Sequence, residues 1–366
     1  MNFDLSGLLA KVRGLVAKKG GSVVGIDLGS SAIKVVQLRR DKGQAILETY
    51  GAIALGPYAG VEIGRATNLP AEKLAEALQD VMRESNVTTK ECGISIPYSS
   101  SLISLIKMPA VPESQLRSMI PLEARKYIPV PIGEVMLDWF VVPKEDGDPE
   151  KGKKEDVLLV AIHKDTLNKY QTIVNTAALS ASFFEIEVFS TARASLGNGI
   201  VPVAILDIGA ATTKLYIVER GIVRESHIIN HGGQELTLAI ASSLGITVME
   251  AEELKREHGL GKEGGEKLQL ATEATLNYLL AEVNRSLVSY QQKAGKSIAT
   301  LIATGGGATL KGFSDFAGGK LSVAVERANP FGKTNAPAFL DPILGDIGPE
   351  FSVAVGVALR KLQEGA

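Results

Sequence analysis

The sequence predicts an α/β protein built from two similar halves. One pattern occurs twice, at Val23–Gln37 (VVGIDLGSSAIKVVQ) and at Val203–Val218 (VAILDIGAATTKLYIV): an apolar run, Asp-x-Gly, small or hydroxyl residues, lysine and a second apolar run. The two aspartates lie 180 residues apart (207 − 27), and a lysine follows each by seven residues (34 − 27 and 214 − 207). Around these motifs β-branched runs alternate with segments of helical spacing, as is typical of α/β proteins. At 366 residues the chain is long enough for two or more domains.

Composition favours well-filled cores and gives no sign of a general nucleic-acid surface. The chain is 45% hydrophobic, and its 39 basic and 41 acidic residues nearly cancel. Cys92 is the only cysteine, which excludes an intramolecular disulfide, and the four histidines show no metal-ligand spacing. No apolar run reaches the roughly 18–20 residues of a membrane span, and no signal peptide is visible. We therefore expect a cytoplasmic protein without a transmembrane segment.

The N-terminal segment has a pattern of its own. Leucines and valines within Leu5–Val16 fall on one helical stripe, and basic residues outnumber acidic ones around it. This pattern fits a helix packed on its own domain or a frayed tail. It also fits a short basic amphipathic helix lying on a membrane surface or on a partner.

The elements follow in an order that places a small unit between the two halves. In the first half we expect strands and one helix at Val23–Gln37, Ala45–Leu55 and Pro70–Glu84. In the segment Cys92–Ala178 we expect strands at Cys92–Ile96, Ser101–Met108, Met136–Val142 and Val157–Ile162. Helices are expected at Pro112–Tyr127, after the second strand, and at Lys164–Ala178, after the fourth. A charged loop is expected at Lys144–Asp156. The second half is expected to contain Val203–Val218, Ile222–Ile229, Glu235–Leu244, Val248–Glu257, Glu266–Lys293, Ile298–Ala303 and Phe351–Gln363.

The repeated hairpin has the residues that a phosphate chain requires. Glycine allows close backbone approach, and successive amides in such a turn form an anion nest. Two carboxylates facing one centre beside a triphosphate would hold Mg²⁺, usually through its waters, and Asp27 and Asp207 are the candidates. The candidate phosphate-binding residues of the two turns are Gly29, Ser30, Ser31, Lys34, Gly209, Ala210, Thr212 and Thr213, with Lys214 as the second nearby cation. A single Asp-x-Gly is more often only a good hairpin turn, but two copies with matched lysines favour a shared phosphate site.

Two further groups are candidates for contacting an adenosine. Gly305, Gly306 and Gly307 follow a β-branched strand and would form a flat ledge for a purine or ribose. Glu252, Lys255 and Arg256 lie about one turn apart on an expected helix. They would hydrogen-bond a ribose or stack on a base, and the alternative is an exposed charged face.

In motif order the chain resembles the actin–hexokinase–chaperone ATPase superfamily. That resemblance makes Glu187–Ala194 and Ser352–Leu359 the two connecting helices that act as a hinge, and it makes Glu187 the candidate catalytic residue near an attacking water. The insert resembles the extra subdomain of FtsA-like proteins, and PLEARKYIPVPIGEVMLDW at Pro121–Trp139 closely resembles the signature of the PilM family of type IV pilus assembly proteins. Val188 replaces a proline common in relatives, and Ala210 and Ala211 replace more polar residues, so hydrolysis is expected to be slow or absent.

The resemblance implies an actin-like ATPase fold, with two duplicated ribonuclease H-like domains and an FtsA-like insert. The expected ranges are 1–20 (basic N-terminal segment), 21–90 (first part of domain I), 91–180 (insert), 181–200 (connecting segment), 201–345 (domain II) and 346–366 (closing helix returning to domain I).

The resemblance also implies partners and a place in the cell. It implies an ATP-binding, Mg²⁺-dependent scaffold at the cytoplasmic face of the inner membrane that binds the cytoplasmic N-terminal peptide of PilN. PilO would be reached through PilN, with motor ATPases and a platform protein as further partners and a homo-oligomer as another possibility. The resemblance places the groove for this peptide between the insert and the first ATPase domain. In the PilM-like signature the candidate groove contacts are Glu123, Arg125, Lys126 and Tyr127, and the alternative is that this helix mainly supports the core.

Two rival functions stay open at this point. One is an active ATPase or sugar kinase on the same fold. A kinase would require an Asp base in the cleft for a substrate hydroxyl, and no Asp beyond Asp27 and Asp207 is convincingly placed for that. The other is an FtsA-like membrane-associated filament protein.

Overall fold

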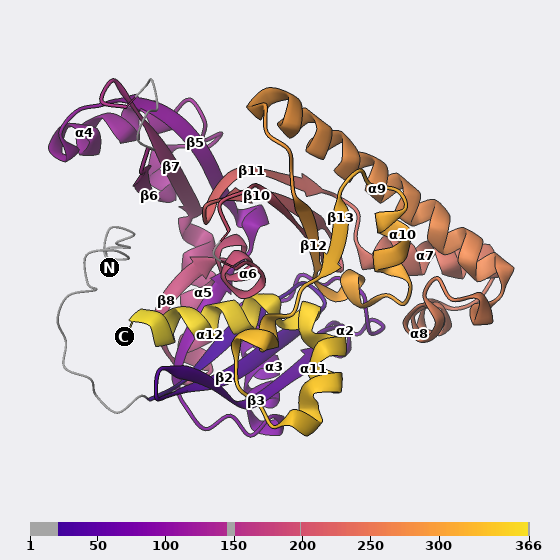
Figure 1. Ribbon diagram of the computed structural model, residues 1–366. Coiled ribbons are helices and arrows are strands. Elements are labelled where there is room, and N and C mark those ends of the chain that lie inside the picture. The colour runs from indigo at the N-terminus through magenta and orange to yellow at the C-terminus, as the bar shows by residue number, and fades with distance from the viewer. Residues whose placement is uncertain (1–20, 145–150, 198, 365–366) are drawn as a thin grey trace.

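Two five-stranded sheets with the same strand order form the body of the protein. The computed structural model describes residues 21–144, 151–197 and 199–364, so the N-terminal stripe expected at 5–16 lies outside the described residues. The order is β3-β2-β1-β4-β8 in one sheet and β11-β10-β9-β12-β13 in the other (Figure 1). The first sheet comprises β1 (Ser22–Leu28), β2 (Ala32–Asp41), β3 (Gln44–Ala54), β4 (Glu91–Ile96) and β8 (Ser180–Ile186). The second comprises β9 (Val203–Ile208), β10 (Thr213–Glu219), β11 (Ile222–Ile229), β12 (Thr300–Thr304) and β13 (Ala324–Arg327).

The repeated sequence motif forms the same hairpin in both sheets. In register, Asp27 lies opposite Lys34 across β1 and β2, and Asp207 lies opposite Lys214 across β9 and β10. In the first hairpin the amide of Gly29 donates to the carbonyl three residues later (3.1 Å), and the second hairpin repeats this bond at 3.0 Å. The spacing of seven residues therefore corresponds to a direct cross-strand aspartate–lysine pair in each half.

Helices cover the sheets and connect the halves. In the first half α2 (Gly56–Ala59) follows β3, and α3 (Ala71–Glu84) packs against α5 (Lys164–Thr176). The second half contains α7 (Gly233–Leu244), α8 (Val248–His258), α9 (Glu266–Ala294), α10 (Phe313–Gly318) and α11 (Asp341–Ile347). The two connecting helices are α6 (Glu187–Ser195) and α12 (Ser352–Glu364), and α12 packs against β1, β2 and β4.

The crossing of α6 and α12 is tight and carries a buried ion-pair cluster. A Cβ on Gly356 of α12 would lie 2.5 Å from the carbonyl carbon of Ser190 on α6, and closer still to its oxygen. Beside this crossing Glu185, buried at the end of β8, bonds Arg193 of α6 at 2.7 Å and Arg360 of α12 at 3.1 Å. Burial would raise the pKa of Glu185, but the two guanidinium groups outweigh it and hold this pKa below its usual value.

A separate three-stranded sheet forms the insert, seen at the upper left of Figure 1. It has the order β5-β7-β6 and comprises β5 (Ser101–Pro109), α4 (Glu113–Ala124), β6 (Val135–Val142) and β7 (Lys154–His163). The range 91–180 that the sequence suggested for this unit is too wide, because β4 pairs with β1 in the first sheet and α5 packs on α3. The first residue of β5, Ser101, pairs with Ile162 near the end of β7, so the chain enters and leaves the insert at one place.

Most elements agree with the sequence expectation to within a few residues. The expected helix Pro112–Tyr127 ends at Ala124, and the expected loop Lys144–Asp156 ends earlier because β7 begins at Lys154. The strand β8 was not expected, since its sequence SASFFEI has one β-branched residue and no clean alternation. The short elements β13, α10 and α11 were also not expected.

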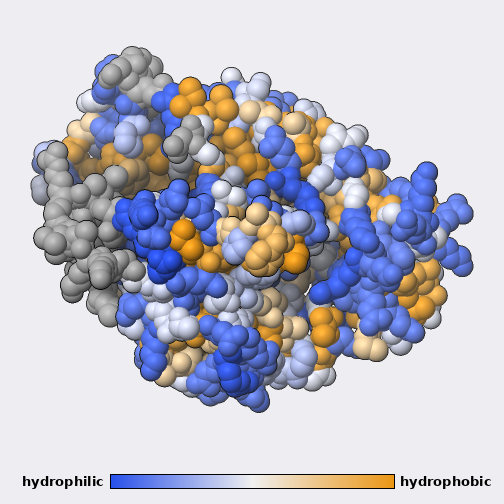
Figure 2. Space-filling view, turned by 60° about the horizontal axis from the view of Figure 1, so that its bottom comes forward, coloured by the Kyte–Doolittle hydropathy of each residue, from blue (hydrophilic) through white to orange (hydrophobic). Residues whose placement is uncertain are grey.

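Among the described residues, one helical stretch is long and apolar enough to cross a membrane by length and composition. It is Ala338–Glu364, and 67% of its apolar window is buried inside the protein. The burial of α12 between the first sheet and α6 accounts for this composition. On the face shown in Figure 2, hydrophilic residues surround smaller hydrophobic patches.

Candidate functional site

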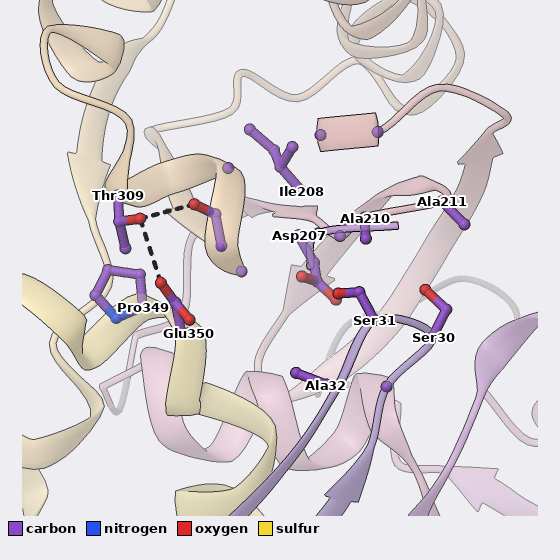
Figure 3. Close-up of a pocket in the computed structure, with 18 of the residues that line it drawn as sticks. Ser30, Ser31, Ala32, Asp207, Ile208, Ala210, Ala211, Thr309, Pro349 and Glu350 are labelled. Atoms are coloured by element: carbon purple, nitrogen blue, oxygen red, sulfur yellow. Dashed lines mark hydrogen bonds between the residues drawn. The ribbon is translucent and has the colours of Figure 1, made fainter. Parts of the chain in front are cut away.

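A cavity of about 670 Å³ lies between the two halves and is lined by both hairpins. Its size is within the range of about 300–1,000 Å³ that is common for small-molecule sites. In Figure 3, Ser30, Ser31 and Ala32 of the first hairpin face Asp207 and Ala210 of the second. The lining includes nearly all residues that the sequence singled out for a nucleotide: Asp27, Gly29, Ser30, Ser31, Lys34, Glu187, Asp207, Gly209, Ala210, Thr212, Lys214, Glu252, Lys255, Arg256, Gly305, Gly306 and Gly307.

Thr213 is the one candidate for phosphate binding that does not line the cavity. Its side chain is fully buried, and its hydroxyl donates to the carbonyl of His231 at 2.7 Å. The alternation of side chains along β10 turns Thr213 away from the face that carries Thr212 and Lys214. The expectation for Thr213 is therefore corrected: its hydroxyl holds the following loop in place.

Three buried carboxylates and a lysine converge at the centre of the cavity. Asp27, Asp207 and Glu187 are 9%, 6% and 6% exposed. The ammonium of Lys214 lies 3.0 Å from Glu187 Oε2 and 3.4 Å from Asp207 Oδ2. Burial opposes the charge of Lys214, but the two carboxylates outweigh it and raise the pKa of this lysine. Lys214 is thus charged at any physiological pH.

Burial makes the ionised forms of Asp27 and Glu187 less stable than they would be in water. Burial raises the pKa of Asp27, although Lys34 and a 3.1 Å hydrogen bond from Ser95 act in the opposite direction. Burial also raises the pKa of Glu187, and Lys214 partly offsets it. Such shifts are common at functional sites, because ligand contacts offset the cost only when a ligand is present.

Glu187 is the first residue of α6, and both of its oxygens are already bonded. Oε1 accepts the backbone amide of Tyr98 at 2.7 Å, and Oε2 accepts Lys214. The residue therefore faces the cavity, as the sequence expectation required, and each of its oxygens already accepts one hydrogen bond.

Two of the three glycines of the ledge, Gly305 and Gly307, are required by close packing against β9 and not by an open surface for a base. Gly305 has a φ of +79°, and a Cβ there would lie 2.6 Å from the carbonyl oxygen of Ile208, so β9 packs directly against it. Gly307 packs on the Ile208 side chain in the same way. Only Gly306 has open space, with Glu350 at 3.9 Å as its nearest neighbour. Two glycines thus seat the ledge on the second hairpin, and the third faces the cavity.

Glu252, Lys255 and Arg256 form one network. Glu252 accepts Lys255 Nζ at 2.5 Å and Arg256 Nε at 2.7 Å, and it also accepts the Thr237 hydroxyl at 2.6 Å. Burial would raise the pKa of Glu252, but Lys255 and these hydrogen bonds hold it below its usual value. The alternative of an exposed charged face fails for Glu252, which is buried, and for Lys255, whose side chain is 13% exposed. It holds only for Arg256, whose side chain is 63% exposed.

Sequence reasoning missed a segment of the first half that crosses to the second half at the cavity. We call residues 61–66 the strap. Within it the amide of Ala66 donates to Gln234 of α7 at 2.9 Å, and Gly64 packs against the Glu252 carboxylate. Thr309 and Glu350, which meet at 3.4 Å on the ledge side, were missed too (Figure 3). No motif marks these residues, because each lies in a loop or a short helix whose place depends on the other half.

The candidate groove residues lie on the insert and do not line the cavity. Glu123 pairs with Lys126 at 2.8 Å near the end of α4. Arg125, Lys126 and Tyr127 follow in an exposed turn, with Tyr127 41% exposed. The alternative of a mainly supporting role does not fit these three side chains, whereas Ala124 and Ile128 beside them are buried in the insert core.

The residues present do not form a ready metal site. Among residues 21–144, 151–197 and 199–364, no group of three His, Cys, Asp or Glu side chains is arranged to hold a metal ion. Lys214 already bonds two of the three central carboxylates. A directly bound divalent ion would have to share these oxygens with an ammonium, so the geometry does not fit direct ligation by Asp207 and Glu187.

Two sheets of identical strand order, each presenting its hairpin to one shared cleft, define an actin-like ATPase fold. The family model of the type IV pilus assembly protein PilM matches residues 25–362. The chain belongs to that family.

Related proteins show the same architecture. The solved structure of a PilM–PilN type IV pilus biogenesis complex is 24% identical, covers 95% of this chain and 99% of that chain, and superposes with a TM-score of 0.79. MreB5 of Spiroplasma citri bound to AMPPNP is 13% identical over 92% of this chain and 95% of that chain, with a TM-score of 0.50. The cell division protein FtsA of Neisseria meningitidis serogroup B (strain ATCC BAA-335 / MC58) is 23% identical over an alignment of 343 positions that covers 82% of this chain and 81% of FtsA.

Proposed function

We propose that the cleft binds ATP and that the nucleotide controls how the insert holds a peptide of the pilus machine. The observation that supports nucleotide binding is the convergence of two hairpins with the same Asp–Lys pairing on one cavity of about 670 Å³. The cleft offers backbone amides in two tight turns and two lysines, which together suit a polyphosphate. The AMPPNP bound to MreB5, a protein of the same fold, supports the choice of a nucleoside triphosphate.

The lining supports one direction for the proposed nucleotide. The phosphate chain would lie between the turns at Ser30, Ser31 and Thr212, with Lys34 beside it. The adenosine would lie toward Gly306 and the Glu252 network, where a flat surface meets hydrogen-bonding groups. Mg²⁺ would reach this cleft on the phosphate chain, with contacts to Asp27 through water.

We further propose that hydrolysis is slow or absent. A general base must accept a proton from the attacking water within hydrogen-bond reach. Glu187 is the carboxylate placed for that role, but its oxygens already accept the Tyr98 amide and Lys214, and the charge of Lys214 disfavours protonation of the carboxylate. A turnover rate near the roughly 10 s⁻¹ typical of enzymes would contradict this proposal and favour an active ATPase or kinase.

The insert is proposed to bind the cytoplasmic N-terminal peptide of PilN. The PilM–PilN complex of the same fold supports this partner. The turn after α4 presents the cations Arg125 and Lys126 next to the exposed Leu122 (62%) and Tyr127 (41%), which suits a short amphipathic peptide. The protein would then lie at the cytoplasmic face of the inner membrane and link PilN, and PilO through it, to motor ATPases and the platform protein.

Tyr98 gives the cleft a physical connection to the insert. It lies just before β5, its amide bonds Glu187 in the cavity, and its hydroxyl lies 2.5 Å from Ser226 Oγ on β11 of the other half. Its ring also meets that of Tyr216 edge-on at 5.7 Å. A nucleotide that changes the distance between the halves must therefore alter the base of the insert, and it can shift peptide affinity by its differential affinity for the two arrangements.

A peptide titration tests the proposal. A fluorescent peptide with the PilN N-terminal sequence is titrated with the full chain, with and without Mg-ATP, and we expect binding below about 100 µM and a Kd that depends on ATP. Tyr98→Phe keeps the ring but loses the bond to Ser226, so its Kd should respond less to ATP. Tyr127→Ala should weaken the binding of the peptide without changing the affinity for ATP.

Three outcomes would contradict parts of this proposal separately. No peptide binding in either condition would remove the proposed partner. Unchanged calorimetric ATP affinity in both Asp27→Ala and Asp207→Ala would remove the shared nucleotide site. ATP-driven polymerisation without peptide binding would favour the FtsA-like filament alternative.

A further inference from the structure

Lys214 has an unusual position for a phosphate-binding lysine. Its side chain is only 13% exposed, and its ammonium lies between Glu187 at 3.0 Å and Asp207 at 3.4 Å. Asp27 is a third carboxylate close enough to raise the pKa of Lys214. The lysine thus lies where three buried acids of the two halves converge.

Two separate elements hold the lysine there. The register of β9 and β10 places its Cα opposite Asp207. Glu187 comes from α6, and its other oxygen is fixed by the Tyr98 amide. Glu187 cannot turn away without losing the Tyr98 amide, and the strand register keeps Lys214 beside Asp207, so the ammonium is preorganised.

An ammonium at this place and a protein-held divalent ion exclude each other. Mg²⁺ and Mn²⁺ take oxygen ligands such as carboxylates. An ion bound to Asp207 and Glu187 would compete with Lys214 for the same oxygens and would repel its charge at short range in a poorly solvated space.

We propose that Lys214 is a resident cation that takes the place of a protein-held divalent ion in the cleft. Given the nucleotide site proposed above, the terminal phosphates would meet this fixed ammonium, and any Mg²⁺ would be held by the phosphates themselves. Removal of the lysine charge would then free the oxygens of Glu187 and Asp207 that face it and create a divalent-ion site of two carboxylates that the wild-type protein does not have.

Metal binding without nucleotide tests this directly. Mn²⁺ alone is titrated into the full chain by calorimetry, with thermal unfolding recorded in parallel. Wild-type protein should show no saturable binding up to about 1 mM. Lys214→Gln should bind one Mn²⁺ and gain thermal stability from it, and Lys214→Gln combined with Glu187→Gln should lose this gain. Lys34→Gln is the matched control, since it removes one positive charge from the same cavity and should gain less.

The results separate this inference from the nucleotide proposal. Saturable Mn²⁺ binding by the wild type, or a folded Lys214→Gln protein without any gain, would overturn the role of Lys214 whether or not ATP binds. A gained metal site in a protein that does not bind ATP would support Lys214 and overturn the nucleotide proposal instead. If Lys214→Gln does not fold, the Mn²⁺ titration is made on Lys214→Arg and on the wild type. Both keep a positive charge at this position and should lack a Mn²⁺ site, so a site in either would overturn the inference.

Discussion

Replacing Gly356 with alanine tests whether the contact between the two connecting helices is as tight as the structure shows. The new Cβ would lie 2.5 Å from the Ser190 carbonyl carbon, about 0.9 Å short of the 3.4 Å at which ordinary contacts begin. The obstructing atoms belong to the backbone of α6, so no side-chain rotation relieves the clash. The helices must separate, and the Glu185 cluster beside them must follow.

The expected cost follows from two opposing terms. Overpacking a well-packed core costs about 1–3 kcal/mol. Alanine in a helix interior recovers up to about 1 kcal/mol relative to glycine. Because the clash is with backbone, we expect the upper part of the first range and a net loss of about 2 kcal/mol. Because the urea dependence grows with chain length and is about 3 kcal/mol/M at the upper end of the range for small proteins, the unfolding midpoint of this 366-residue chain should fall by roughly 0.7 M or less.

A matched substitution gives the control. Gly345 lies in α11 and is exposed, and a Cβ added there would meet no other atom within 4 Å, so Gly345→Ala should be neutral or slightly stabilising. Urea unfolding followed by far-UV circular dichroism measures both variants. If Gly356→Ala is as stable as Gly345→Ala, the helices are not in the contact described and the hinge argument is wrong.

Three further predictions concern charge and closure. Asp27→Asn should raise the thermal stability of the nucleotide-free protein at pH 7, because burial raises the pKa of this carboxyl and its ionised form costs stability. The gain should shrink as the pH falls and the wild-type carboxyl is protonated. A gain that does not depend on pH would contradict this prediction. Glu185→Gln should cost about 3 kcal/mol or more, since it leaves two arginines without their buried partner. As the wild-type pKa is held below the ordinary 4.5, the contribution of Glu185 is complete above that pH and should disappear in acid unfolding as pH falls further. Gly64→Ala should speed the release of a fluorescent ATP analogue, because the new Cβ would lie 2.6–2.9 Å from atoms of the Glu252 carboxyl group. Gly60→Ala is the control, since Gly60 also has a positive φ but open space around it, and it should not change the release rate. Equal release rates for the two variants would show that the strap does not close the cleft.

The sequence predicts the duplicated part of the fold well, because the signal there is local. The apolar runs around Asp27 and Asp207 contain the β-branched residues that favour strands, and the fixed spacing to lysine sets the hairpin register. The strand β8 lacks such a pattern and forms because it pairs with β4 and leads into α6. The boundaries of the insert were too wide for the same reason: which sheet β4 joins depends on a partner far away in sequence.

The sequence predicts which residues line the cavity but not which of them bond to one another. The motifs indicate the residues that line the cavity, but they do not show that Lys214 bonds Glu187, since that contact depends on how α6 meets the second sheet. They also do not show that Tyr98 joins the cavity to the insert. Each of these contacts joins elements whose relative position no short sequence pattern encodes.

The antiparallel pairing of Ser101 with Ile162 has a consequence for how such a protein can diversify. Since the insert begins and ends at adjacent residues, its length and sequence can change while β4 and α5 keep their places in the first half. At the matching position of the second half, after β12, the chain carries only the glycine ledge and α10 before β13. After a gene duplication, one copy of this junction could thus keep a compact turn while the other acquired a module for a new partner. If the insert binds the peptide as proposed, an insert grafted from a relative at these two residues should bring the relative's peptide preference with it.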